Sequence, residues 1–423
     1  MKTKAQQHNL QHTKLDLRKL IAFSSIFVLA FSTLSLATHT AHATTPAFTF
    51  TNYEIARSWD QAHAGVTCPN TGTNCWNWHG EPNIATAPDG TIYVSSENTA
   101  FNHPSECNGF VQLLVYICGG TGAWKSTDQG NHFTTLTSPN TIFPVQNNPV
   151  TFWGGDTHIA VAPAKNANGQ YNVYIVSLEA AGSGLIGVSE ATSQDGGTTW
   201  SNNPVFNFPN PIANPLVEDR PWVAAYGATT VCVSVHEGAV IGDVYCSINS
   251  GQTFTFAGSA FDAAHAWLTA ETSIPGAIHI DPNTGYMYVP FSGLASATEA
   301  ADPVEVACGG LTGINCPFGL HALYMAVSHG IGQPFIDYTV YVNPNVHANY
   351  GSQFVAMGLD SGGNVYEASS DGVSVSYSYS TNTGQTWNGP FQVNQSPSNW
   401  AIEPWLAGGA PGKIDVVWYG TSN

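Results

Sequence analysis

The sequence predicts an all-β protein of the β-propeller class, with four-stranded antiparallel blades. An octamer that begins with serine, carries glycine at its fifth position and ends with an aromatic residue occurs five times. Its copies start about 50 to 80 residues apart, which is the length of one blade with its loops. Six strand-turn-strand segments alternate with the octamers. Six blades are therefore expected, with seven as the alternative.

The octamers are predicted to be hairpin turns. Asp or Asn at the third position can bond the backbone two residues on, and the glycine supplies a positive φ. Gly330 replaces the acid in the fourth copy, which is half a match. A structural role is favoured over ligand binding, so no site residue is placed there. The copies are STDQGNHF from Ser126, SQDGGTTW from Ser193, SINSGQTF from Ser247, SHGIGQPF from Ser328 and STNTGQTW from Ser380.

The strand-turn-strand segments supply the first two strands of each blade, while the third strand ends at the octamer serine and the fourth follows its aromatic residue. Alternation of Val231, Val233 and Val235 with polar or small residues predicts half-buried strands. The last blade is left incomplete. Either a strand within 48–55 closes the ring, or the final strands of the blade are missing from the sequence. We favour the second alternative. The segments start at Glu81, Asp156, Asp219, Pro275, Gly351 and Glu403.

Residues 1–43 have the layout of a secretory signal peptide. A basic start precedes an apolar run over 20–37, and Ala41-His42-Ala43 offers a cleavage site. A retained membrane anchor is the alternative. Residues 44–423 are then expected to form a single propeller domain, secreted and extracellular, without a membrane association after cleavage.

The charge balance argues against nucleic acid as a partner. The chain has 10 Lys and Arg against 28 Asp and Glu, a net charge of −18. Phosphate binding needs clustered basic residues, and few remain once the leader is removed. A monomer that acts on an extracellular glycan or glycoprotein is expected. The basic residues outside 1–43 are Arg57, Lys125, Lys165, Arg220 and Lys413.

The eight cysteines fall into four close couples, which predicts disulfides in an exported protein. Zinc thiolate sites are the alternative, but no Cys-x-x-Cys occurs, so no metal site is assigned to them. The expected pairs are Cys68 with Cys75, Cys107 with Cys118, Cys232 with Cys246, and Cys308 with Cys316.

Charged residues gather where the first strand of each blade begins, although only 9% of the chain is charged. In a propeller these strands line the central channel. Paired carboxylates can divide the work of glycoside hydrolysis, and an arginine can bind a substrate carboxylate or keep an acid ionised. The catalytic candidates are Asp156, Glu218, Asp219, Arg220 and Glu403.

Two other roles remain open for these charges. Asp219 and Arg220 can pair with each other while the remaining acids cap strands, or the acids can hold a structural Ca²⁺. No cofactor is required. The candidate substrate-binding residues are Arg57, His79, Glu81, His158, Trp76, Trp78 and Tyr419. Of these, Trp76 and Trp78 can either stack on sugars or pack between blades.

With these octamers, residues 50–423 resemble the sialidase superfamily, specifically exported proteins with BNR or Asp-box repeats. The resemblance implies a propeller that acts on or binds glycans. Sialidases of the family use three arginines, a Tyr/Glu nucleophile pair and an Asp acid/base. Only Arg57 and Arg220 remain outside the leader, and Arg57 lies in IARSW rather than in an Arg-Ile-Pro motif. Orthodox sialidase activity is thus disfavoured.

Three functions remain open. The first is an exported glycoside hydrolase or lyase of sialidase-like fold. The second is a non-catalytic propeller that binds carbohydrate or protein at the cell surface. The third is a structural module whose acids keep it soluble in an acidic habitat.

Overall fold

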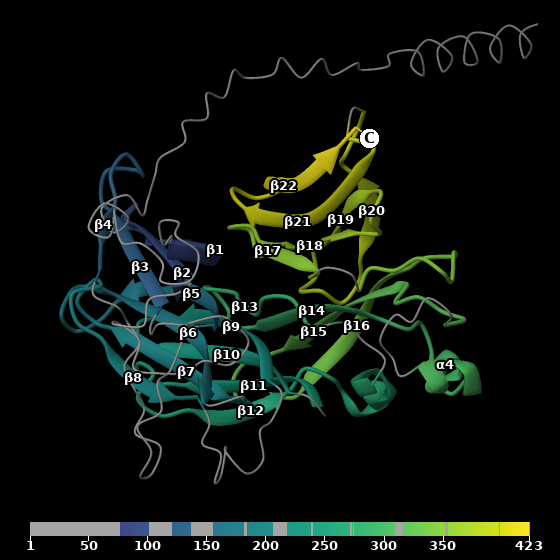
Figure 1. Cartoon of the computed structure of the whole chain (residues 1–423), viewed down its shortest axis with the longest axis horizontal. Coiled ribbons are helices and arrows are strands. Elements are labelled where there is room, and N and C mark those ends of the chain that lie inside the picture. The colour runs from purple at the N-terminus through teal and green to yellow at the C-terminus, as the bar shows by residue number, and fades with distance from the viewer. Residues whose placement is uncertain are drawn as a thin grey trace, which may run out of the picture. The chain divides into compact units, whose positions relative to one another are not determined.

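The computed structural model describes residues 77–100, 121–136, 155–181, 184–205, 218–237, 240–270, 273, 275–308, 316–351, 354–396 and 398–422. All of them belong to the second of two compact units, Tyr53–Asn423. Within these residues the strands form five four-stranded sheets and one two-stranded sheet (Figure 1).

The first three sheets follow one another in the chain. The first contains β1 (Asn77–Thr86), β2 (Ile92–Ala100), β3 (Thr121–Ser126) and β4 (Thr134–Thr135). The second contains β5 (Gly155–Lys165), β6 (Tyr171–Ala181), β7 (Gly184–Ser193) and β8 (Ser201–Pro204). The third contains β9 (Glu218–Tyr226), β10 (Thr230–Glu237), β11 (Val240–Ser247) and β12 (Thr255–Ser259).

The remaining sheets repeat the pattern. The fourth contains β13 (His279–Ile280), β14 (Met287–Gly293), β15 (Ala322–Ser328) and β16 (Phe335–Val342). The fifth contains β17 (Ala356–Leu359), β18 (Val365–Ser370), β19 (Val375–Ser380) and β20 (Asn388–Gln392). The sixth contains β21 (Trp400–Gly408) and β22 (Ile414–Thr421). Short helices, which the sequence did not predict, are η1 (Ala263–Ala270), α3 (Ala297–Ala300) and α4 (Pro303–Cys308).

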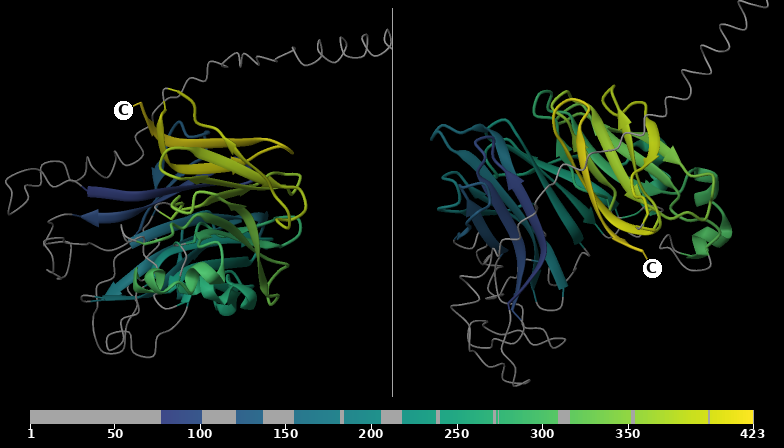
Figure 2. Two further views of the ribbon diagram at one scale, coloured as in Figure 1. Left: turned by 90° about the vertical axis from the view of Figure 1, so that its right-hand side faces the viewer. Right: turned by 90° about the horizontal axis from the view of Figure 1, so that it is seen from above.

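The arrangement is a β-propeller, which confirms the predicted fold class. Each sheet is an antiparallel meander in chain order, and the first strands of successive sheets lie beside one another. Figure 2 shows the sheets succeeding one another from purple β1 to yellow β22. The backbones of β17 and β21 lie very close to each other at Gly408 of β21, where a Cβ would overlap the carbonyl oxygen of Leu359 in β17. Six or seven blades stays a prediction, because the sixth sheet has two strands.

Strand β10 is buried on both faces, so the half-buried strand expected from its alternation is wrong. Val231 and Val233 pack with residues of the second sheet, including Tyr174. Cys232, on the opposite face, packs with residues of the fourth sheet, including Met287. A sheet placed between two others has no solvent-facing side, so the small or polar residues of β10 lie in the core as well.

Four octamers form one recurrent turn between the third and fourth strands of a sheet. In the first, Ser126 Oγ accepts the N–H of Gly130 at 2.9 Å, and Asp128 Oδ1 accepts the N–H of His132 at 2.9 Å. The copies from Ser193, Ser247 and Ser380 repeat both bonds. In the half-matching copy, Ser328 Oγ instead donates toward carbonyl oxygens of Gly330 and Gln333.

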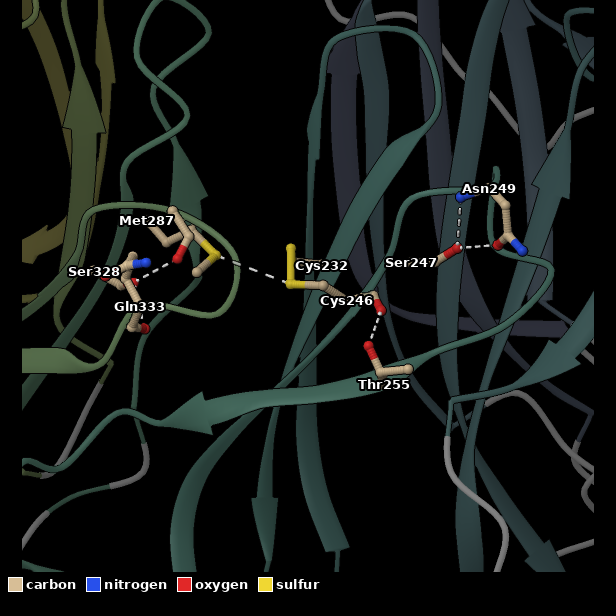
Figure 3. The surroundings of a disulfide bond; sticks show 9 residues. Cys232, Cys246, Ser247, Asn249, Thr255, Met287, Ser328 and Gln333 are labelled. Atoms are coloured by element: carbon tan, nitrogen blue, oxygen red, sulfur yellow. Dashed lines mark hydrogen bonds between the residues drawn. A yellow bond between two sulfur atoms is a disulfide. The ribbon is translucent and has the colours of Figure 1, made fainter.

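A disulfide joins Cys232 and Cys246, as predicted from their spacing. The two residues are register partners on β10 and β11. In Figure 3, Met287 of β14 faces this bond, with its Sδ 4.0 Å from Sγ of Cys246. The bond therefore lies in the apolar layer between the third and fourth sheets.

Several expectations lie outside the described residues: the signal peptide, the 48–55 strand, Arg57, Trp76 and the cysteine pairs 68/75 and 107/118. The side chain of Cys308 is also outside them, although Cys316 is disulfide-bonded. Among the helices that are described, none has the length and apolar character needed to cross a membrane.

Candidate functional site

A cleft of about 670 Å³ opens where the first strands of four sheets meet. Strands β1, β5, β9 and β21 supply most of its wall, and β22 and the segment before β17 complete it. The lining residues are Pro82, Asn83, Ile84, Asp156, Thr157, His158, Arg220, Pro221, Trp222, Gly351, Phe354, Glu403, Pro404, Trp405 and Tyr419.

Each of these four first strands is interrupted by a β-bulge at the cleft. The register with the neighbouring strand shifts between Gly80 and Asn83, at Asp156, at Arg220-Pro221 and at Glu403-Pro404. A bulge leaves residues out of the ladder and turns their side chains away from the alternating pattern. Glu81, Asp156, Arg220 and Glu403 thus lie at the register shifts in the first strands of the first, second, third and sixth sheets.

Arg220 and Glu403 have left-handed backbones, with φ of 49° and 51°. In the described residues, the other non-glycine residues with positive φ are Gln129, Ser250 and Thr383, all at the fourth position of an octamer turn. A left-handed residue with a Cβ costs about 1–2 kcal/mol, and such strain gathers at functional sites. Outside the turns, that cost falls on two of the three charged residues that line the cleft.

Arg220 and Asp156 form an ion pair on one wall of the cleft. Arg220 Nε lies 3.3 Å from Asp156 Oδ2, and both side chains are largely buried, at 26% and 17% exposed. The guanidinium also lies over the ring of Phe354, 5.0 Å from its centroid. The carboxylate of Asp156 and the phenylalanine ring together hold the guanidinium in place.

Aromatic side chains from different sheets form the floor of the cleft around Trp222. Its ring centroid lies 5.3 Å from that of Phe354 and 6.1 Å from that of Trp405. Trp222 Nε1 donates to the carbonyl oxygen of Pro275 at 3.0 Å, which fixes the indole. Trp405 is 39% exposed and Tyr419 is 71% exposed, so both offer faces on which a ligand can stack.

His158 supports this floor as a neutral imidazole. The Val223 N–H donates to its Nδ1 at 3.1 Å, and the ring meets Trp222 edge to face. Burial, with a smaller contribution from nearby His279, lowers the pKa of His158 to about 3. The side chain that was expected to bind substrate therefore carries no charge near neutrality, and its Nδ1 is engaged by the backbone.

The cleft brings together five of the predicted residues: Asp156, His158, Arg220, Glu403 and Tyr419. Trp78, His79 and Glu81 lie on β1, and Glu218 and Asp219 lie on β9, with side chains outside the described part. Asp156 pairs with Arg220, while the predicted pairing of Asp219 with Arg220 lies outside the described side chains. The structural Ca²⁺ among the channel acids stays a prediction.

Sequence reasoning missed Trp222, Phe354 and Trp405. A signal for two of them was present: Arg220-Pro221-Trp222 and Glu403-Pro404-Trp405 share a charged-Pro-Trp pattern at the start of a first strand. Phe354 lies just before β17 and carries no comparable pattern. It joins the site only through the packing of the fifth sheet.

No model of a known protein family matches the chain. A search of curated proteins also gives no match.

Solved structures with a similar arrangement of the chain include three carbohydrate-active proteins. An α-L-arabinanase of Penicillium chrysogenum is 11% identical over 81% of this chain and 93% of its own, with a TM-score of 0.46. A leech intramolecular trans-sialidase is 12% identical over 89% of this chain and 68% of its own, with a TM-score of 0.47. A PL25 ulvan lyase is 12% identical over 81% of this chain and 79% of its own, with a TM-score of 0.44. At these values the fold assignment rests on the sheet topology described above.

Proposed function

We propose that this protein is an exported glycoside hydrolase whose cleft binds a glycan. The observation that carries the proposal is the left-handed backbone of Arg220 and Glu403, at equivalent bulges in one aromatic-floored cleft. Strained charged residues at register breaks are costly to a fold, and the cleft is where that cost can be offset by binding or chemistry.

The two carboxylates of the cleft have different surroundings. Asp156 is paired with Arg220 and largely buried, which suits an ionised base or nucleophile. Glu403 is exposed in the same cleft, where its carboxyl group can reach a bound glycan. Glycoside hydrolysis uses two carboxyl groups, and Asp156 and Glu403 are the acidic residues that line the cleft.

The aromatic side chains supply the binding surface. Trp405 and Tyr419 present partly exposed rings beside Glu403, and sugar faces stack on such rings. This surface alone would serve a non-catalytic carbohydrate-binding propeller. The ion pair of Arg220 with Asp156 favours the enzyme, because stacking on neutral sugars needs no buried charge.

The test is turnover on a panel of extracellular polysaccharides by wild-type protein and by E403Q and D156N. The proposal is supported if the wild type hydrolyses a glycan and both variants still bind it but turn it over at rates reduced by about 100-fold or more. D415N is the matched control, since Asp415 is exposed on β22 and does not line the cleft.

Binding without turnover by the wild type would make the protein a carbohydrate-binding module. An unsaturated sugar product would make it a lyase. Either outcome would overturn hydrolysis. Export is tested separately, by N-terminal sequencing of the mature protein, which is expected to begin at Thr44.

A further inference from the structure

We propose that Asp262, His265 and Asp337 form a binding site for a divalent transition-metal ion of the zinc class, separate from the cleft. One ligand atom from each of the three side chains lies within 4.8 Å of the other two. Asp262 and His265 belong to the connection that follows β12, and Asp337 lies on β16, the outer strand of the fourth sheet (Figure 1). None of the three lines the cleft.

The spacing of the ligand atoms fits a single ion. His265 Nδ1 lies 2.9 Å from Asp262 Oδ1 and 3.8 Å from Asp337 Oδ2. Nitrogen and oxygen ligands that bind one zinc ion at about 2.1 Å are about 3.0–3.4 Å apart. Small side-chain adjustments would therefore bring all three atoms into coordination.

Asp337 supplies an independent indication of a ligand. Its carboxylate is fully buried, and Oδ1 has no hydrogen-bond partner among the described residues. Its Oδ2 accepts the N–H of Asp262 at 2.9 Å. A buried carboxylate with one oxygen lacking a donor is costly, and a cation bound to the same carboxylate would offset that cost.

The carboxylates are oriented before any ion binds. The backbone N–H of Asp337 donates to Asp262 Oδ2 at 3.0 Å, which reciprocates the bond from Asp262 N–H to Asp337. Outer hydrogen bonds of this kind fix ligand geometry in metal sites. His265 is 30% exposed, which leaves a path for the ion and room for water to complete its coordination.

The ligand types select the class of ion. Imidazole nitrogen suits zinc and neighbouring transition metals, while Ca²⁺ and Mg²⁺ prefer oxygen ligands alone. The ion would join the connection between the third and fourth sheets to the outer edge of the fourth sheet. We therefore infer a structural role for it.

The test is calorimetric titration of the untagged, chelator-treated full chain with Zn²⁺, with thermal unfolding in parallel. Wild-type protein is expected to bind one equivalent at this site and to melt at a higher temperature with Zn²⁺. H265N should weaken that binding about 100-fold or more and abolish the thermal shift.

H132N is the matched control, because His132 and Asp128 also form a close pair, at 2.6 Å, but have no third metal-ligating side chain beside them in the described part of the chain. It should bind Zn²⁺ as the wild type does. Absence of binding by folded wild-type protein, or equal binding by wild type and H265N, would overturn the site. Tighter binding of Ca²⁺ than of Zn²⁺ would overturn the ion class.

Discussion

Arg220 approaches one oxygen of Asp156 twice. Its Nε lies 3.3 Å from Asp156 Oδ2, and its backbone N–H donates to the same oxygen at 3.4 Å. Side chain and backbone of one residue converge in this way because the left-handed bulge turns the Arg220 N–H out of the ladder. The pair joins β5 of the second sheet to β9 of the third.

Removing the charge of Arg220 should impair catalysis more than folding. R220M places an apolar side chain of similar length beside Phe354 and removes the guanidinium from Asp156. We expect turnover of the identified glycan to fall about 100-fold or more, with the fold intact by circular dichroism. K413M is the control, since Lys413 is exposed at the β21–β22 turn. An active R220M would remove Asp156 and Arg220 from the mechanism.

Alanine is usually the more stabilising of alanine and glycine in a strand, but the left-handed backbone of Glu403 predicts that glycine is the more stabilising at this position. Both E403A and E403G lack the carboxylate, but glycine adopts a φ of 51° without strain. E403G should therefore be more stable than E403A by about 1 kcal/mol in urea unfolding. The same comparison at Gln129, with a φ of 62° in a turn, should give a similar difference. A more stable E403A would contradict the bulge geometry.

Glu367 predicts a loss of stability between about pH 4 and pH 8. Burial raises its pKa to about 8, and the nearby Ser369 hydroxyl offsets part of the rise. Because the pKa is higher in the folded protein than in the unfolded chain, the stabilising contribution is complete below about pH 4 and is lost as the pH rises through 8.

E367Q removes this titration. Urea unfolding at pH 5, 7 and 9 should show E367Q gaining on the wild type toward pH 9, by about 1–3 kcal/mol. E403Q, which changes an exposed carboxylate, should track the wild type at all three values. Parallel pH curves for E367Q and the wild type would show that Glu367 titrates normally.

The disulfide between β10 and β11 should stabilise the third sheet. Its cysteines are 14 residues apart, and a loop of that size gives about 3 kcal/mol in the chain-entropy model. We expect C232A/C246A to lower the free energy of unfolding by about that amount under oxidising conditions. An unchanged unfolding midpoint would mean that packing between the third and fourth sheets, including Met287, holds β10 and β11 without the bond.

The fold was predictable from the sequence because its signals are local. The octamers place a turn at fixed positions, and the third strands end at their serines, as at Ser126 and Ser193. The pairing of Cys232 with Cys246 followed from short spacing for the same reason. Blade number depended on closure of the ring, which no local pattern determines.

The site was predictable only in part. Charge at the start of the first strands identified Asp156, Arg220 and Glu403, since charged residues are rare in this chain. The approach of Asp156 to Arg220 was not predictable, because the two residues lie on different sheets and a bulge sets the position of Arg220. Phe354 enters the cleft through tertiary packing alone.

The bulges at the cleft carry charged residues that can be replaced without disturbing the strand pairing. Glu81, Asp156, Arg220 and Glu403 lie at register shifts in the first strands of the first, second, third and sixth sheets, outside the hydrogen-bonded ladders. A replacement at Asp156, Arg220 or Glu403 changes the charge that lines the cleft without removing a ladder bond. New substrate preferences could thus arise from single substitutions at these positions while every blade keeps its architecture, and a library confined to them would sample that diversity in the laboratory.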